Sequence, residues 1–268
     1  MIHLAVTGAT GRMGKAIINA IIGGKAASLS GALERDGSLF LGKDAGEAAG
    51  AEKTGVKITD SLDRAFRKAD CIIDFSAPES SIRTLEYAVE HDKALVIGTT
   101  GFSHHQRDFI KDLCHRTRVV MAPNMSIGVN LLLKLVHLTA SVLGSDYDIE
   151  IVEAHHRHKK DAPSGTAIRI AEVVAAAVDR DLEKVAVYER KGIVGERRPE
   201  EIGIQSIRAG DIVGDHTVIF GGVGERIELI HKASSRETFA MGAVKAARWV
   251  VDRPNGIYDM QDVLGLKG

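Results

Sequence analysis

The first half of the chain alternates short apolar runs with longer segments in which apolar residues recur at helical spacing. Short apolar runs between amphipathic helices are typical of a parallel sheet that helices cover on both faces. The pattern therefore predicts an N-terminal Rossmann-like, doubly wound α/β domain. The expected strands span residues 2–7, 28–33, 71–75, 94–97 and 119–122, and the expected helices span 11–22, 78–91 and 103–117.

The second half has a different pattern. A long apolar helix is expected over 127–143, and four later segments alternate polar and apolar side chains between glycine-rich turns. Alternation with a period of two predicts strands with one covered face, so we expect an α+β domain with a mostly antiparallel or mixed sheet. The expected strands span 148–154, 202–208, 216–220 and 226–231.

These patterns predict two domains. Residues 1–125 form the expected dinucleotide-binding domain, and an alanine-rich helix near 238–251, within the C-terminal stretch 237–268, is expected to pack back on it. Residues 126–236 form the expected substrate-binding and oligomerisation domain, in which the polar segment 181–200 should be exposed. A chain of 268 residues, of which 44% are hydrophobic, is long enough for both.

Charge and cysteine content narrow the class of protein. The net charge of −1 argues against a nucleic-acid-binding protein, whose domain would be clearly basic. The chain has no uninterrupted run of about 18 apolar residues, so no membrane helix is expected, and its N-terminus does not resemble a signal peptide. Cys71 and Cys114 stand alone in apolar surroundings, which favours reduced, buried thiols and a cytoplasmic protein.

The sequence GATGRMG, from Gly8 to Gly14, stands between the first expected strand and the first expected helix. Glycines at such a turn let the backbone approach a pyrophosphate, and the following helix offers N–H groups and a favourable dipole. The spacing G-x-x-G-x-x-G is a variant of the familiar G-x-G-x-x-G, and an ordinary strand–helix turn is the alternative. The position of the turn, with an acidic residue after the second strand, favours a dinucleotide.

That acidic residue is Glu34, which follows Gly14 by 20 positions. A carboxylate there can accept hydrogen bonds from the ribose hydroxyls of NADH, and the guanidinium of Arg35 suits the 2′-phosphate of NADPH. A solvated loop pair is the alternative, and neither cofactor is excluded. Two further turns, GTTG at 98–101 and APN at 122–124, follow expected strands at the ends where α/β proteins bind ligands, although capping turns would look similar.

Residues 153–167 read EAHHRHKKDAPSGTA and concentrate positive charge in a nearly neutral chain. A metal site is disfavoured, because H-E-x-x-H is absent and adjacent residues on a strand point to opposite faces. A solvated loop is the second interpretation. The third is an anion site with an internal acid, which the helix start at Ser164, Gly165 and Thr166 favours: glycine permits close approach, hydroxyls donate, and helix N–H groups face the anion.

The same stretch resembles the signature of the dihydrodipicolinate reductase family, now called 4-hydroxy-tetrahydrodipicolinate reductases. Its pattern Glu-x-His-x-x-x-Lys-x-Asp-x-Pro-Ser-Gly-Thr-Ala is matched without departure from Glu153 to Ala167. GATGRMG, the Glu34–Arg35 pair, DFSAPES, GTTG and the N-x-S-x-G of 124–128 also follow in the family's order, so the resemblance covers essentially the whole chain. Pro123 stands where some members have alanine, which leaves Asn124 available.

The resemblance implies the reduction of a cyclic imine dicarboxylate in lysine and diaminopimelate biosynthesis, with NADH or NADPH, by a homotetramer joined through the second domain's sheet. It implies that His155 and Lys159 are the acid–base pair, and that His156, Lys159, Ser164, Gly165 and Thr166 bind substrate. Implied cofactor contacts are Gly8, Ala9, Thr10, Gly11, Arg12, Met13, Glu34, Arg35, Phe75, Gly98, Thr99, Thr100, Ala122, Pro123, Asn124 and Met125.

Two other functions compete with this one. A short-chain dehydrogenase would share a glycine turn of this kind, but it needs Tyr-x-x-x-Lys, and none of the four tyrosines is followed by lysine at that spacing. A redox-sensing nucleotide-binding module would keep the glycine turn without needing the basic stretch beside Ser164. Turnover of substrate with a reduced nicotinamide nucleotide separates the enzyme from the sensor.

Overall fold

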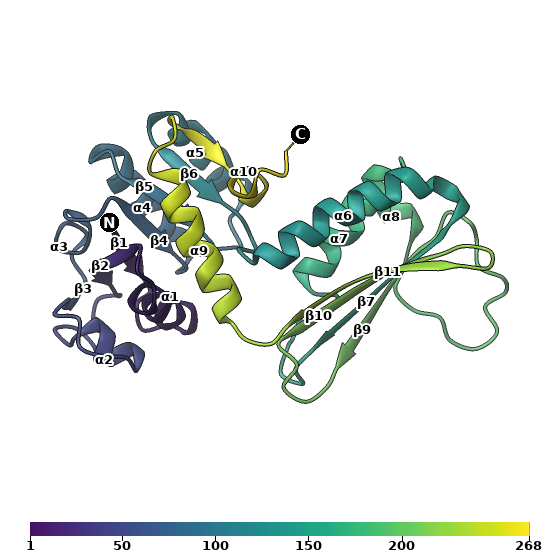
Figure 1. Cartoon of the computed structure of the whole chain (residues 1–268), viewed down its shortest axis with the longest axis horizontal. Coiled ribbons are helices and arrows are strands. Elements are labelled where there is room, and N and C mark those ends of the chain that lie inside the picture. The colour runs from purple at the N-terminus through teal and green to yellow at the C-terminus, as the bar shows by residue number, and fades with distance from the viewer. Residues whose placement is uncertain (268) are drawn as a thin grey trace. The chain divides into compact units, whose positions relative to one another are not determined.

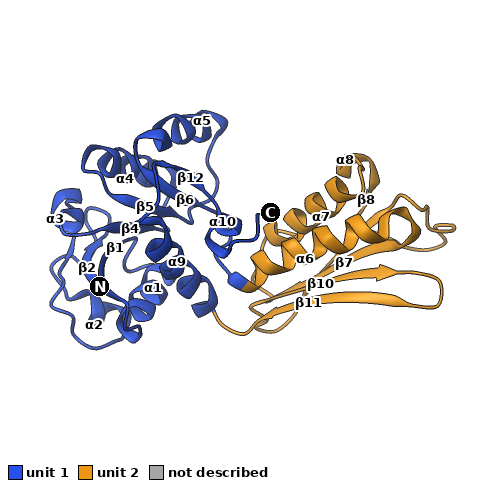
Figure 2. Ribbon diagram, turned by 45° about the horizontal axis from the view of Figure 1, so that its top comes forward, with its two compact units in different colours: residues 1–127, 236–268 blue, residues 128–235 orange. Residues whose placement is uncertain are grey.

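The computed structural model describes residues 1–267, which form two compact units (Figure 2). Unit 1 contains residues 1–127 together with the C-terminal stretch that begins at Arg236. Unit 2 contains residues 128–235. Each unit has a sheet and a hydrophobic core of its own.

Unit 1 is built on a seven-stranded sheet in the order β12-β6-β5-β4-β1-β2-β3, and every neighbouring pair is parallel (Figure 1). The strands are β1 (Ile2–Thr7), β2 (Ala27–Leu33), β3 (Ile58–Thr59), β4 (Cys71–Asp74), β5 (Ala94–Ile97), β6 (Arg118–Met121) and β12 (Gly256–Tyr258). The helices are α1 (Arg12–Gly23), α2 (Ala45–Ala49), α3 (Leu62–Phe66), α4 (Pro78–Glu90), α5 (His104–Leu113), the 3-10 turn η1 (Cys114–Arg116), α9 (Glu237–Val250) and α10 (Met260–Leu264).

Successive residues of the central strands belong to different cores, because both faces of the sheet are covered. Val6 and Ile73 pack in a cluster that includes residues of α1 and α9. Their neighbours Ala5 and Ile72 pack in a second cluster that includes residues of α4 and α5. This arrangement explains why the strands read as continuous apolar runs, and it confirms the predicted doubly wound α/β fold.

The order of the strands places a topological switch point at β1. This strand pairs with β2 on one side and with β4 on the other, so the chain winds outward in both directions from this point. In open α/β sheets, ligands bind outside the carboxyl ends of the strands at such a switch point. The turns that follow β1 and β4 begin at Gly8 and Phe75.

Unit 2 has a five-stranded sheet in the order β11-β10-β7-β9-β8, with α6 and α7 over one face (Figure 2). Its elements are α6 (Ile127–Leu143), the 3-10 turn η2 (Gly144–Asp146), β7 (Asp148–His155), α7 (Gly165–Ala177), α8 (Leu182–Val185), β8 (Ala186–Val187), β9 (Ile202–Arg208), β10 (Gly214–Gly221) and β11 (Arg226–Ala233). The β10–β11 and β7–β10 pairs are antiparallel, whereas β7–β9 and β8–β9 are parallel. The sheet is therefore mixed, as an α+β domain allows.

Several short elements were not predicted. The strands β3 and β8 have two residues each and β12 has three, which is too short for an alternating pattern to appear in the sequence. The helices α2, α3 and α10 have five residues each and are capped by the residues just before them, Asp44, Ser61 and Asp259, whose side chains accept N–H groups of the first turn. Such short edge strands and single-turn helices form by pairing with or packing on neighbouring elements, which the local sequence pattern does not show.

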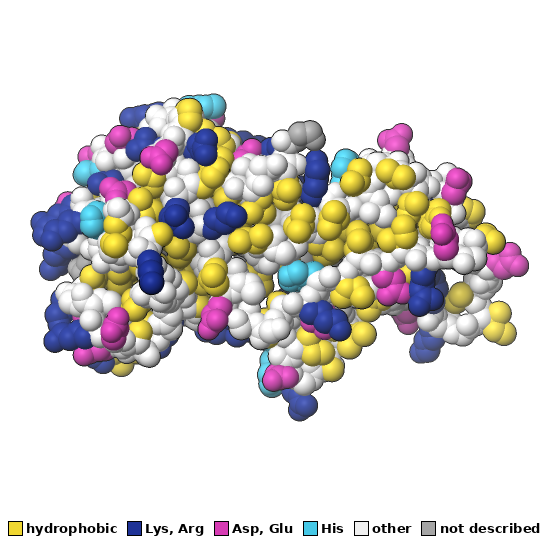
Figure 3. Space-filling view, viewed as in Figure 1, with side chains coloured by type: hydrophobic (Ala, Val, Ile, Leu, Met, Phe, Trp, Pro, Cys, Tyr) yellow, Lys and Arg dark blue, Asp and Glu magenta, His cyan; other side chains and the backbone are white. Residues whose placement is uncertain are grey.

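The helix α6 is apolar on two sides. Val129, Leu132 and Val136 face inward and are buried, whereas Leu131, Leu135, Leu138 and Val142 are 40–74% exposed; Figure 3 shows apolar side chains gathered along this helix. Within the described residues, 127–146 is the one helical stretch long and apolar enough to cross a membrane by length and composition. Asn130, Lys134 and His137 interrupt it, which is why the sequence shows no continuous apolar run.

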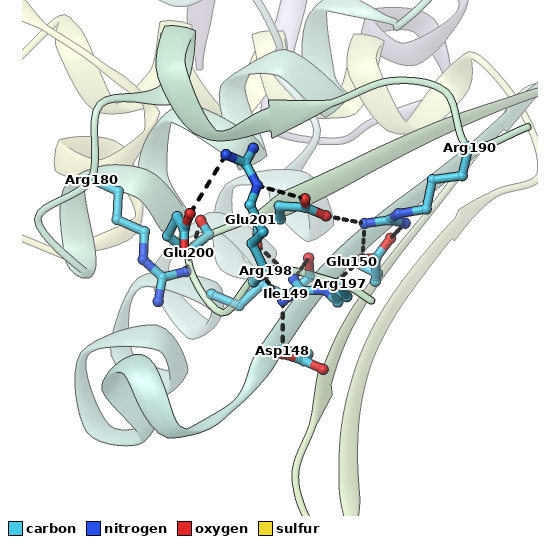
Figure 4. A network of polar contacts seen from close by, with 9 residues as sticks. All are labelled: Asp148, Ile149, Glu150, Arg180, Arg190, Arg197, Arg198, Glu200 and Glu201. Atoms are coloured by element: carbon cyan, nitrogen blue, oxygen red, sulfur yellow. Dashed lines mark hydrogen bonds and ion pairs between the residues drawn. The ribbon is translucent and has the colours of Figure 1, made fainter. Parts of the chain in front are cut away.

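The polar segment before β9 is fastened to the sheet by ion pairs (Figure 4). Arg190 contacts the carboxylates of Glu150 and Glu201 at 2.9 and 3.2 Å, and Arg197 contacts Asp148 at 2.7 Å. Gly203 makes room for this network, because a Cβ there would lie 1.8 Å from a carboxylate oxygen of Glu150. The segment is thus exposed, as predicted, but it is anchored at its base.

Candidate active site

The glycine turn after β1 is held by contacts that exclude side chains. Gly8 has a φ of 59°, in the left-handed region that favours glycine, and its carbonyl accepts the N–H of Gly11 at 2.9 Å. A Cβ on Gly14 would lie 2.1 Å from that same carbonyl. Gly11 is the N-cap residue of α1, and no side chain accepts the first N–H groups of the helix there. Such a cradle fits a pyrophosphate.

Glu34 is tied to this turn. Its Oε2 accepts the N–H of Thr10 at 3.0 Å and the hydroxyl of Thr10 at 2.6 Å, and its Oε1 accepts the N–H of Arg35 at 3.1 Å. Partial burial raises the pKa of Glu34, but the hydrogen bonds from Thr10 and Arg35 outweigh it and hold the pKa below its ordinary value. Glu34 therefore presents a carboxylate beside the turn, and Arg35 follows it with an exposed side chain.

The ends of β4 and β5 meet around Asp74. Its Oδ1 accepts hydroxyls of Thr7 at 2.8 Å, Ser76 at 2.5 Å and Thr99 at 3.3 Å, so one buried carboxyl joins the ends of three strands. Burial raises the pKa of Asp74 despite these hydrogen bonds. Gly98 lies directly against Phe75, because a Cβ on Gly98 would come within 2.2 Å of the ring.

The turn after β6 completes this edge of unit 1. Ala122 donates its N–H to the carbonyl of Ile97 at 3.1 Å, and Asn124 accepts the N–H of Ser126 at 2.9 Å. Met125 is buried in the core, where Gly242 of α9 approaches it so closely that a Cβ would lie 1.8 Å from its carbonyl oxygen. The sequence-predicted cofactor residues thus gather at the carboxyl ends of β1, β2, β4, β5 and β6, and their role stays a prediction.

In unit 2, the basic stretch begins at the end of β7, where His155 contacts a buried carboxylate. Nδ1 of His155 lies 2.5 Å from Oε2 of Glu153, which is 0% exposed. Arg208 donates to both oxygens of Glu153, at 2.9 and 2.7 Å. Burial raises the pKa of Glu153, but the hydrogen bonds from Arg208 and His155 outweigh it, so the pKa is lowered and the carboxyl is ionised.

Lys159 lies in the loop that follows β7. Its Nζ donates to both carboxylate oxygens of Asp161 at 2.9 Å, which lowers the pKa of Asp161. The N–H of Lys159 also bonds to the carbonyl of His156 at 3.1 Å, so the loop turns back on itself. The loop therefore holds His156 and Lys159 close to the end of β7, with the Lys159 ammonium fixed by a neighbouring carboxylate.

Ser164 caps α7 and joins this loop to the sheet. Its side chain accepts the N–H of Ala167 at 3.2 Å, and its own N–H bonds to Oε1 of Glu153 at 3.2 Å. Gly165 begins the helix, and a Cβ there would meet no atom within 4 Å, so the space above the helix N-terminus is open. The acid candidates and the anion-binding turn predicted from the sequence thus meet within unit 2.

Three residues of this site were not predicted as functional. Glu153 was recognised only as a motif position, and Arg208 and His216 come from other strands. Register explains their presence: Arg208 of β9 lies opposite His155, and His216 of β10 lies opposite Glu153. The one signal in the sequence is that Glu153 and His155 are two apart on a strand, which puts both side chains on one face.

The fold and these contacts define a class of protein: an oxidoreductase with a dinucleotide-binding unit and a second unit that carries a histidine–carboxylate pair beside the N-terminus of α7. Family models for the N-terminus and the C-terminus of dihydrodipicolinate reductase match residues 2–125 and 128–264. The chain belongs to the dihydrodipicolinate reductase family.

Two relatives carry the name of this family, and a third shares the fold. A 4-hydroxy-tetrahydrodipicolinate reductase of Hahella chejuensis is 55% identical over 267 residues, which is 100% of both chains. The dipicolinate-bound dihydrodipicolinate reductase of Paenisporosarcina sp. TG-14 matches the fold with a TM-score of 0.77 at 24% identity, over 98% of both chains. An amine dehydrogenase of Mycobacterium smegmatis shares the fold more distantly, with a TM-score of 0.59 at 14% identity over 96% and 94% of the chains. These matches confirm the predicted family and fold class.

Proposed function

We propose that this chain reduces 4-hydroxy-tetrahydrodipicolinate to tetrahydrodipicolinate with a pyridine nucleotide, a step of lysine and diaminopimelate biosynthesis, and that its two units divide the work. Family membership supports the reductase activity. The observation that carries the assignment of the site is the junction of His155, Glu153 and Ser164, which puts an acid and a helix N-terminus together in unit 2. The substrate is a small cyclic dicarboxylate, for which these groups are suited.

Unit 1 fits the cofactor. The cradle around Gly8 and Gly14 would hold the pyrophosphate, and Glu34 would accept from the adenosine ribose. When bound, the reduced nicotinamide supplies the hydride, which is chemistry that no side chain offers. Arg35 gives the phosphate of NADPH a partner and Glu34 gives NADH one, so both nucleotides are accepted.

Unit 2 binds the dicarboxylate and supplies a proton. The first turn of α7, with Gly165 and Thr166, receives a substrate carboxylate, together with the positive charge of Lys159 and its neighbours. Negative charge that develops on the ring nitrogen is relieved by a proton from Nζ of Lys159, or from Nε2 of His155 when that ring carries a proton on both nitrogens. A positioned acid of this kind contributes about 100- to 10,000-fold in rate.

A direct assay tests this function. The purified chain is mixed with the substrate and with NADH or NADPH, and the absorbance of the reduced nicotinamide is followed. We expect turnover with both nucleotides and a fall in kcat of about 100- to 10,000-fold in His155→Ala, whereas His158→Ala, an exposed neighbour in the same stretch, should turn over normally. Nucleotide binding without turnover would instead favour the redox-sensing module.

We also propose that the chain forms a homotetramer through the open face of the unit 2 sheet. The residues in register across this face include Val152, Thr217 and Ile230, and Ile230 is 52% exposed. Apolar side chains on an open sheet face favour association with another surface. Light scattering should report a tetramer, and Ile230→Asp should give smaller species, whereas Leu39→Asp, an exposed residue of unit 1, should not.

A cytoplasmic location is part of the same proposal. Cys71 and Cys114 are free and buried, and burial raises the pKa of both thiols. Neither cysteine therefore reacts readily, and the fold uses no disulfide within its described residues. A reducing compartment suits such a chain.

A further inference from the structure

Glu153 is a buried carboxylate of unit 2 with several hydrogen-bond donors around it. The hydrogen bonds that it accepts include those from Nδ1 of His155 at 2.5 Å, from Arg208 at 2.9 and 2.7 Å, and from the N–H of Ser164 at 3.2 Å. Taking a carboxylate out of water is costly unless it is paired and hydrogen-bonded. The pairing with Arg208 is bidentate, which meets that condition and leaves the carboxylate able to act on its other neighbours.

The two oxygens of Glu153 have different tasks. Oε2 accepts from His155 and from one nitrogen of Arg208, whereas Oε1 accepts from Ser164 and from the other nitrogen of Arg208. An ionised carboxylate can only accept hydrogen bonds, so His155 must donate through Nδ1. Nδ1 is thereby the protonated nitrogen of the neutral ring, and Nε2 is the nitrogen left for exchange of a proton.

The surroundings of the His155 ring are consistent with this orientation. The contact with Glu153 is the one hydrogen bond that the His155 ring makes among the described residues, and its side chain is 12% exposed. Nε2 lies over Gly214, where a Cβ would stand 3.1 Å from it. The absence of a side chain at Gly214 leaves the ring room to keep this orientation.

Glu153 also reaches the anion-binding turn. The N–H of Ser164, the residue that caps α7, bonds to Oε1, and Arg208 donates to the carbonyl of Asp161 at 2.6 Å. One carboxylate and its arginine therefore fix both the histidine and the loop that leads into the helix. A displacement of this carboxylate would move the acid and the anion-binding turn together.

We propose that Glu153 is the positioning residue of the substrate site, which fixes His155 as the Nδ1–H tautomer, leaves Nε2 for exchange of a proton and sets the turn at Ser164. The proposal rests on the function proposed above, in which His155 exchanges a proton with the substrate. Glu153 itself does not touch the reacting atoms. It acts through His155 and through the cap of α7.

The geometry specifies the effect of Glu153→Gln. The glutamine oxygen is expected to take the place of Oε1, where Ser164 and Arg208 donate, so the NH₂ group takes the place of Oε2. An NH₂ group donates to Nδ1 of His155 and cannot accept from it, so the ring should switch to the Nε2–H tautomer. The same NH₂ group would face a donor nitrogen of Arg208, and two donors repel each other. The tautomer is therefore also measured in the wild-type protein.

The tautomer is read directly from the ¹⁵N shifts of histidine-labelled protein at a pH where the rings are neutral. The chain has 11 histidines, and the spectrum of His155→Gln identifies the signals of His155. In the wild type we expect protonated Nδ1 and unprotonated Nε2, and in Glu153→Gln the reverse. An Nε2–H tautomer in the wild type, or no change in the variant, would overturn the proposal without bearing on the reductase activity.

Kinetics complete the test. Glu153→Gln should lower kcat by about 100- to 10,000-fold, the range of a misplaced acid, while the Kd for NADPH stays unchanged. If Glu153 acts through His155, the double variant Glu153→Gln, His155→Gln should be no slower than His155→Gln alone, whereas multiplied losses would overturn the proposal. A fully active His155→Gln would instead overturn the acid role proposed for His155, and a wild type without turnover would overturn the proposed function, so the failures are distinguishable.

Discussion

The hydroxyl of Ser164 lies 3.1 Å from Nε2 of His216, and it also accepts the N–H of Ala167. A hydroxyl has one proton and two lone pairs, so Ser164 pairs either with an unprotonated Nε2 or with an Nε2–H of the neutral His216 ring. Burial, and then the charge of His155, lowers the pKa of His216 to about 4. The residue that caps α7 is thus hydrogen-bonded to a histidine that stays uncharged at neutral pH.

This arrangement makes stability depend on pH between about 6.5 and 4. His216 binds a proton in the unfolded chain below about pH 6.5 but in the folded chain only near pH 4, so its contribution is complete above 6.5 and is lost as pH falls. The expected loss at pH 4.5 is about 2–3 kcal/mol. Urea denaturation at pH 7 and 4.5 should show a smaller difference in His216→Gln than in the wild type or in His158→Gln, and equal differences would contradict the assignment.

Arg35→Ala should discriminate between the nucleotides. A charge-assisted hydrogen bond to the 2′-phosphate is worth roughly 1.5–3 kcal/mol, so the KM for NADPH should rise about ten- to a hundredfold, whereas the KM for NADH should change much less. Arg116→Ala removes the same charge at η1, beside the amino end of β6, and should affect neither. Equal losses with both nucleotides would make Arg35 a structural residue.

Lys159→Ala should impair turnover far more than nucleotide binding. Lys159 belongs to unit 2 and pairs with Asp161, so its removal takes a cation and a proton donor from the substrate side. We expect kcat to fall by about 100- to 10,000-fold with little change in the NADPH affinity measured by calorimetry. Lys160→Ala, in which an exposed neighbour is lost, is the matched control. Loss of nucleotide affinity along with the rate would show that Lys159 has been misassigned.

Asp74 should tolerate asparagine better than alanine. Its raised pKa means that the folded chain binds a proton that the unfolded chain releases, so this residue lowers stability as pH rises above the ordinary value of 3.8. Asp74→Asn removes that cost and keeps an acceptor for Thr7, Ser76 and Thr99. Asp74→Ala leaves these hydroxyls without their acceptor and should lower the free energy of unfolding by about 1–3 kcal/mol. Thermal melts at pH 8 would contradict this account if the asparagine variant were the less stable of the two.

The sequence by itself determined the features that depend on neighbours along the chain. A strand, a glycine turn and a helix in succession predict the cradle from Gly8 to Gly14, because glycine permits the tight turn and close backbone approach that the cradle needs. Continuous apolar runs gave the parallel sheet, since strands buried on both faces cannot alternate. The helix start at Ser164 could also be predicted, because capping is local.

Only the tertiary structure decided what surrounds His155. Arg208 reaches Glu153, and His216 reaches Ser164, because β9 pairs parallel and β10 pairs antiparallel with β7 in one particular register, and no spacing in the sequence encodes that register. Asp74 likewise joins hydroxyls from the ends of three strands. The physical reason is burial: a carboxylate in a core must find donors from whatever strands lie beside it, and strand pairing alone determines which donors those are.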